Sequence, residues 1–204
     1  MLVKEVRKIN DRKRKVLFED GFSFVLYSAE IHRFQIRSGE DVPEEVIRQI
    51  CEEILKKRSR LRCLNLLKTS DRTVSWLKER LMRDGYPEEI TQQALDYAAS
   101  FHYTDDLRYT RNYIRQCAGR KSIKQIEYKL INKGVDRDTV RAALLEAREQ
   151  DSDFEAEAIR ALARKRGFDP ERAGREEYAK FVRHLSAKGF GMETIRRVTG
   201  HTPA

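Results

Sequence analysis

The 204-residue chain repeats one short pattern three times, and this repetition constrains its fold more than any other feature. Each copy has two apolar residues four positions apart, a glycine four positions after the second, and an apolar residue directly after the glycine. The copies run from Leu77 to Tyr86, from Ile126 to Val135 and from Phe181 to Phe190. This spacing is typical of an amphipathic helix that ends at a glycine, with the next apolar residue folding back onto it.

The three glycines, Gly85, Gly134 and Gly189, are 49 and 55 residues apart. Repetition at this period predicts stacked helical modules, which usually bind other macromolecules rather than catalyse reactions. We expect three-helix repeats at residues 43–101, which include a lead-in helix, at 102–150 and at 151–204.

Residues 1–42 have a different pattern and predict a small β-rich extension. Asp20-Gly21 separates two apolar, β-prone runs, which is a strong signal for a hairpin. The run from Asn10 to Lys15 is strongly basic and is interpreted as a solvated loop between strands, with contact to phosphate as the alternative. A small sheet of this kind is marginal alone and must pack on the helices that follow.

From Pro43 onward the pattern predicts only helices. Pro43 is expected to open a helix that reaches Leu67 with a break near residues 57–59. Ser70 or Asp71 is expected to cap the next helix, although the hydroxyl of Thr73 also fits an N-cap. The stretch Phe168–Gly174 has no counterpart in the second repeat, and residues 201–204 are expected to fray.

The composition is that of a charged chain with an excess of basic residues. There are 42 Lys and Arg against 33 Asp and Glu, which gives a net charge of +9, a pI near 9.5 and a mean hydropathy of −0.72. The excess is dispersed, with +4 in residues 1–67, +3 in 68–150 and +2 in 151–204. Such a distribution favours a long anionic partner.

Several classes of protein are disfavoured by the motifs that the sequence lacks. Cys51, Cys63 and Cys117 are scattered, which argues against a disulfide framework or a zinc site and favours a reducing compartment. No phosphate-binding glycine loop, membrane-spanning run or signal-peptide core is present. Asp105-Asp106 precedes a helix and is interpreted as its start rather than as a catalytic pair. We therefore expect a cytoplasmic protein that is not an enzyme and has no metal or cofactor.

Three stretches together resemble the RecX family of bacterial regulators of the recombinase RecA. They run from Arg72-Thr73 through Leu77 and Leu81 to Gly85-Tyr86, from Tyr103 to Tyr109, and from Lys121-Ser122 through Ile126 and Leu130 to Gly134-Val135. The resemblance covers nearly the whole chain and is weakest in the third repeat. The chain departs from the family pattern at Trp76, where an acidic residue is usual, and at Tyr109-Thr110, where Phe-Ala is common.

The resemblance implies a mainly α-helical fold of three tandem three-helix repeats in a curved, elongated array behind the small N-terminal sheet. It also implies a monomeric regulator that binds RecA filaments on single-stranded DNA. Such a regulator modulates, and usually inhibits, recombinase, ATPase and coprotease activity in homologous recombination, DNA repair and the SOS response. Weak direct contact with DNA is an additional expectation.

The second repeat contains the residues that we expect to contact the filament. They are the basic side chains around the turn between its first two helices: Arg111, Arg115, Arg120, Lys121, Lys124 and Lys129. Charge reversal at Arg115, Lys121 and Lys124 together is expected to weaken filament binding without changing the melting temperature. Two alternatives stay open: a helix-turn-helix DNA-binding protein and a helical adaptor that binds protein without DNA.

Overall fold

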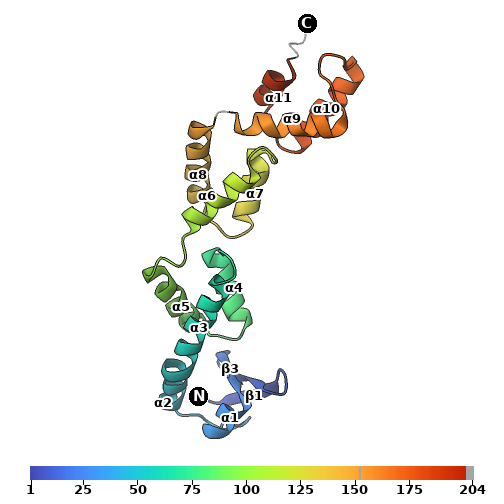
Figure 1. Ribbon diagram of the computed structural model, residues 1–204. Coiled ribbons are helices and arrows are strands. Elements are labelled where there is room, and N and C mark those ends of the chain that lie inside the picture. Colours follow the sequence, from blue (N-terminus) through green and yellow to red (C-terminus); the bar gives the residue numbers. More distant parts are fainter. Residues whose placement is uncertain (152, 201–204) are drawn as a thin grey trace. The chain divides into compact units, whose positions relative to one another are not determined.

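The computed structural model describes residues 1–151 and 153–200. It begins with a three-stranded antiparallel sheet in the order β1-β2-β3, followed by helices (Figure 1). The strands are β1 (Val3–Lys8), β2 (Lys13–Phe18) and β3 (Ser23–Tyr27). The predicted hairpin at Asp20-Gly21 is confirmed, because β2 and β3 pair on either side of it.

One face of the sheet forms the first hydrophobic core. Strand alternation places Val16 and Phe18 on the same face, where both are almost completely buried. Helices of the first half of the chain cover this face, so the sheet packs on helices, as predicted from the sequence. The core comprises Val3, Val16, Phe18, Phe24, Leu26, Ile36, Val42, Ile47, Ile50, Leu55 and Ile90.

Two local features of the N-terminal region differ from the sequence-based expectation. The basic run from Asn10 to Lys15 is not all loop, because Lys13, Arg14 and Lys15 already belong to β2. A short helix, α1 (Ser28–Arg33), follows the sheet directly and was not predicted. The side chain of Glu30 accepts a hydrogen bond from the backbone N–H of Tyr27 at 2.8 Å, which closes the first turn of α1.

The long helix predicted from Pro43 to Leu67 consists of three consecutive parts. They are α2 (Glu44–Gln49), a π-helical segment η1 (Ile50–Leu55) and α3 (Lys56–Leu67). The predicted break near residues 57–59 is therefore wrong, and the irregularity lies earlier. The i→i+5 pattern of η1 allows Ile50 and Leu55 both to be fully buried, so core packing accounts for the irregularity.

The first three-helix unit consists of α3, α4 (Val74–Arg83) and α5 (Glu88–Ser100). Thr73 is the N-cap of α4 and its side chain accepts a hydrogen bond from Trp76 N at 3.2 Å. The expectation that Ser70 or Asp71 caps this helix is therefore wrong. The core of the unit consists of Cys63, Leu77, Leu81, Ala94, Leu95 and Ala98.

The backbone at Gly85, just after α4, contacts the sheet and so joins this unit to it. Val25 N donates a hydrogen bond to Gly85 O at 3.1 Å, so the outer edge of β3 is paired at this point. Gly85 has φ +96°, and a Cβ atom there would lie 2.1 Å from Val25 Cγ2. Only glycine combines this backbone conformation with so close an approach.

The second three-helix unit consists of α6 (Asp106–Cys117), α7 (Ile123–Ile131) and α8 (Arg137–Gln150). Asp106 lies in the first turn of α6, as the helix-start interpretation predicted. The core of this unit comprises Ile114, Cys117, Ile126, Leu130, Val135, Val140, Ala143, Leu144 and Phe154.

The third three-helix unit consists of α9 (Phe154–Arg166), α10 (Arg175–Ala187) and α11 (Met192–Thr199). The extra stretch between α9 and α10 contributes to the core, because the Phe168 ring stacks on Phe181 with centroids 4.0 Å apart. Gly200 ends α11 in a left-handed conformation, with φ 65°. The expectation that residues 201–204 fray lies outside the described residues.

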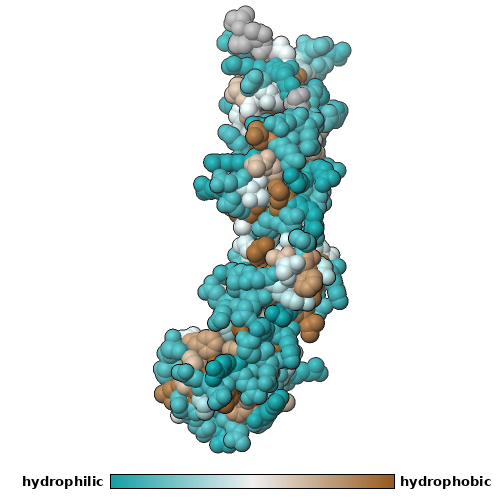
Figure 2. All heavy atoms as spheres, turned by 90° about the vertical axis from the view of Figure 1, so that its left-hand side faces the viewer, coloured by the Kyte–Doolittle hydropathy of each residue, from teal (hydrophilic) through white to brown (hydrophobic). Residues whose placement is uncertain are grey.

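These elements form two compact units, Met1–Asp105 and a second that begins at Asp106. Hydrophilic side chains cover most of the face drawn in Figure 2, with small hydrophobic patches between them. None of the described helices is long and apolar enough to cross a membrane.

Candidate partner-binding surface

Positive charge is concentrated around the turn between α6 and α7. From Leu107 to Val135 the chain has eight basic residues and one acidic residue, Glu127. The even distribution over larger segments hides this local excess. A concentration of one sign on neighbouring helices creates a local positive potential that attracts anionic partners.

The turn has a defined backbone conformation. Gly119 has φ +67° and ends α6. Ser122 then caps α7: its Oγ accepts a hydrogen bond from Gln125 N at 3.2 Å, and Ser122 N donates to Gln125 Oε1 at 3.4 Å. This reciprocal capping box fixes the start of α7, so Arg120 and Lys121 are held on a short, ordered connection.

Arg115, Arg120 and Lys121 line one open hollow at the C-terminal end of α6. We name these three residues the basic turn. In the part of the chain that the structure describes, none of the three forms an ion pair with a carboxylate. Their charges are therefore available to a partner.

Lys121 is oriented by an aromatic neighbour. Its Nζ donates a hydrogen bond to Tyr113 Oη at 3.4 Å and lies 5.5 Å from the centre of the Tyr113 ring. The hydrogen bond to Tyr113 raises the pKa of Lys121 above its ordinary value. This contact therefore favours the charged ammonium form.

Arg111 and Arg115 line a second hollow of about 290 Å³ between α6 and α8. They are one helical turn apart, as the sequence indicated. Arg111 Nε is 2.9 Å from Glu146 Oε2, so its charge is partly compensated within the chain. Arg115 donates a hydrogen bond to the neutral Asn112 Oδ1 at 2.9 Å and keeps its full charge.

Lys124 and Lys129 do not join the basic turn as a single surface. They are five positions apart on α7, which separates their directions by about 140° around the helix. A Cβ atom built on Gly189 would lie 2.9 Å from Lys124 Cβ, so the base of this side chain packs against the third three-helix unit. Lys129 is exposed in the last turn of α7.

Sequence reasoning did not include three residues that the fold brings to this region. Tyr109 and Tyr113 lie on α6 with nearly parallel rings whose centres are 6.5 Å apart. Lys133 Nζ lies 5.9 Å from the Tyr109 ring centre and 5.8 Å from that of Tyr113. The four-residue spacing of the two tyrosines was the available signal, but the position of Lys133 depends on how α7 packs on α6.

Ser122 also connects the second and third three-helix units. Its Oγ donates a hydrogen bond to Lys188 O at 2.6 Å, and the side chain is fully buried. Beside it, Ile123 N donates to Oε1 of the buried Glu155 at 2.8 Å. The start of α7 is therefore held by polar contacts from both units.

Replacing Ser122 by alanine is expected to lower the free energy of unfolding of the second compact unit by about 2 kcal/mol. The change removes the N-cap and leaves the carbonyl of Lys188 without this donor. Urea unfolding followed by circular dichroism measures the loss. Asp136→Ala is the matched control. Asp136 is exposed and caps α8, because its Oδ2 accepts from Asp138 N at 2.9 Å and from Thr139 N at 3.1 Å. Equal losses would contradict a contribution from the contact with Lys188.

The described residues contain little that could perform metal or thiol chemistry. No group of three or more His, Cys, Asp or Glu side chains in the described ranges could hold a metal ion. Burial raises the pKa of the Cys51 and Cys63 thiols to about 11, which makes both poor nucleophiles at neutral pH.

Fold and surface together define a helical-repeat protein that presents basic residues on an ordered turn. Three family models match it: those of the first, second and third three-helix domains of RecX, at residues 60–97, 105–144 and 153–199. These ranges cover more than half of the chain and correspond to the three helical units described above. The chain belongs to the RecX family.

Individual relatives and solved structures agree with this assignment. Regulatory protein RecX of Clostridioides difficile (strain 630) is 29% identical, over 95% of this chain and 91% of the relative. Regulatory protein RecX of Clostridium botulinum (strain Alaska E43 / Type E3) is 23% identical, over 95% of this chain and 92% of the relative.

The solved structures share the fold. A crystal structure of regulatory protein RecX superposes with a TM-score of 0.65 at 20% identity, over 98% of this chain and 99% of the other. The crystal structure of RecX from Lactobacillus salivarius superposes with a TM-score of 0.61 at 19% identity, over 72% of this chain and 95% of the other.

Proposed function

We propose that this protein binds RecA nucleoprotein filaments on single-stranded DNA and inhibits their recombinase, ATPase and coprotease activities. It would act in the cytoplasm, as a monomer, during recombination, DNA repair and the SOS response. Membership of the RecX family supports the regulatory class. The observation that carries the proposed binding surface is the basic turn, whose charges have no carboxylate partner in the described chain.

The mechanism requires binding and no chemistry by this chain. A filament on DNA exchanges between assembly states, and a ligand shifts that exchange by the difference in its affinity for the states. Arg115, Arg120 and Lys121 would supply attraction toward a DNA-bearing, negatively charged partner, which makes binding sensitive to salt. The arginines can also form bidentate contacts with carboxylates of a protein partner.

The helix-turn-helix alternative has less support. A recognition helix that enters the major groove should carry a one-sided group of base-reading side chains. Helix α8 instead carries both positive and negative side chains. Arg141 Nη1, for example, lies 3.8 Å from Asp138 Oδ1. Glu146, which pairs with Arg111 of α6, adds a further negative charge to α8.

Co-sedimentation with RecA tests the proposal in three arms: RecA on single-stranded DNA, RecA without DNA, and DNA alone. We expect this protein to sediment with the RecA–DNA filament more strongly than with either component. Sedimentation with DNA alone to the same extent would contradict filament binding. Loss of that DNA binding on charge reversal in α8 would then support the helix-turn-helix alternative. Binding that is independent of DNA would instead support a protein adaptor.

A further inference from the structure

The N-terminal sheet carries a second concentration of positive charge, outside the three helical units. From Lys4 to Lys15 there are seven basic residues and two acidic residues. Both carboxylates are already engaged: Glu5 Oε2 accepts from Arg7 Nη2 at 3.0 Å, and Asp11 Oδ1 lies 2.7 Å from Lys8 Nζ. The other five basic residues form no ion pair within this stretch.

Those five side chains find no compensating charge elsewhere in the described residues. They are Lys4, Arg12, Lys13, Arg14 and Lys15, and no carboxylate of residues 1–151 or 153–200 forms an ion pair with them. Arg14 donates only to the carbonyl oxygens of Asn10, at 2.7 Å, and Lys13, at 3.2 Å. Lys13 Nζ lies 5.6 Å from the centre of the Tyr27 ring.

Strand register places several of these cations on one face. Arg7 is directly opposite Lys15, and Lys13 is directly opposite Tyr27. Alternation along β2 puts Lys13 and Lys15 on the face opposite to buried Val16, about 6.6 Å apart along the strand. Arg7 is already paired with Glu5, so Lys13 and Lys15 are the uncompensated strand cations of this face.

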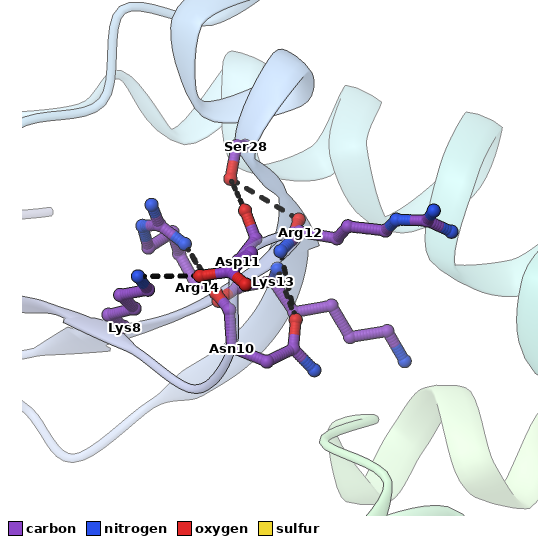
Figure 3. Close-up of polar contacts among 7 residues, drawn as sticks. All are labelled: Lys8, Asn10, Asp11, Arg12, Lys13, Arg14 and Ser28. Atoms are coloured by element: carbon purple, nitrogen blue, oxygen red, sulfur yellow. Dashed lines mark hydrogen bonds and ion pairs between the residues drawn. The ribbon is translucent and has the colours of Figure 1, made fainter.

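The loop beside this face is ordered by its own hydrogen bonds, as Figure 3 shows. Asn10 Oδ1 accepts from Arg12 N at 3.0 Å and Lys13 N at 2.9 Å. Ser28 N donates to Arg12 O at 2.8 Å, which fixes the loop to the start of α1. The side chains of Arg12 and Lys13 extend to one side of the loop, and those of Lys8 and Arg14 to the other. Holding charged groups in place before binding reduces the entropy lost on binding.

We propose that Arg12, Lys13 and Lys15, here named the basic sheet face, bind the phosphate backbone of nucleic acid. Lys13 and Lys15, about 6.6 Å apart along β2, can contact successive phosphates of one strand. The Tyr27 ring is already covered by Lys13 and by Arg58, whose guanidinium is 4.4 Å from the ring centre. Binding is thus to phosphates, without selection of bases.

This inference goes beyond the proposed function and does not depend on it. The basic sheet face lies before residue 60, where the first matched three-helix domain begins. It is tested with nucleic acid alone, without RecA, so failure here leaves the filament proposal standing and the reverse also holds.

The test uses the full-length chain and fluorescence anisotropy of a labelled single strand of mixed sequence. The variant is Arg12→Gln, Lys13→Gln and Lys15→Gln together. We expect its affinity to fall roughly tenfold or more at low salt, and the slope of log affinity against log salt to become shallower by about 2. The matched control removes the same charge from exposed sites on the first helical unit, with Lys57→Gln, Lys68→Gln and Arg83→Gln, and is expected to bind nearly as the parent does.

Three results would overturn the proposal. One is a parent protein that does not bind the strand at low salt. Another is a sheet variant that binds it as tightly as the control variant does. The third is a sheet variant that loses binding to phosphatidylserine-containing vesicles while its binding to the strand is unchanged, which would assign the face to lipid. Melting curves for both variants verify that the sheet stays folded.

Discussion

Replacing Gly85 by alanine is expected to lower the free energy of unfolding of the first compact unit by about 4 kcal/mol. Two penalties act together at this residue. Its φ of +96° is unfavourable for any residue with a Cβ atom, and the new Cβ would lie 2.1 Å from Val25 Cγ2. Because Val25 N also donates to Gly85 O, relief of the clash would break the contact between β3 and the helices.

The measurement is urea unfolding followed by the fluorescence of Trp76, the single tryptophan, which is partly buried and packs against the core of the same unit. Gly21→Ala is the matched control. Gly21 also has a positive φ, of +88°, but no atom lies within 4 Å of a Cβ built there. It should therefore show only the backbone penalty, about 1 kcal/mol. Equal losses at the two positions would mean that the approach to Val25 contributes nothing.

Charge reversal of the basic turn, Arg115→Glu, Arg120→Glu and Lys121→Glu together, is expected to weaken binding to the RecA filament about a hundredfold. The change replaces attraction by repulsion at three neighbouring positions. Arg120 replaces Lys124 in this variant, because Arg120 belongs to the basic turn, whereas the base of Lys124 lies against Gly189. The affinity is measured by anisotropy with labelled protein and filament on single-stranded DNA.

The matched control reverses three basic residues of α8: Arg137, Arg141 and Arg148. It changes the net charge by the same amount within the same compact unit. We expect its affinity to fall much less than that of the basic-turn variant. A larger loss in the α8 variant, together with loss of binding to bare DNA, would favour a recognition-helix role for α8. Unchanged melting temperatures are required of both variants.

The sequence was sufficient to predict features set by local interactions. Gly85, Gly134 and Gly189 all have positive φ and each follows a helix, as the repeated pattern indicated. The hairpin at Asp20-Gly21 and the N-cap at Ser122 are likewise encoded by adjacent residues. Turns and caps depend on few neighbours, so a single sequence is enough to locate them.

Features set by distant contacts were missed. The π-helical segment Ile50–Leu55 depends on packing against the sheet, and nothing in its own composition distinguishes it from an α-helix. For the same reason the sequence could not show that the six candidate residues do not form one surface. The base of Lys124 lies against Gly189, and Arg111 pairs with Glu146 on another helix. The domain limits after residues 42, 101 and 150 stay predictions.

The central claim is that this protein acts on the RecA filament, and the ATPase rate of RecA on single-stranded DNA tests it most directly. RecA is held constant while this protein is added in amounts well below those that saturate the DNA, and binding to bare DNA is measured in the same buffer. The account predicts that ATP hydrolysis falls at these substoichiometric amounts. An unchanged ATPase rate, at protein concentrations where bare DNA is fully bound, would contradict it.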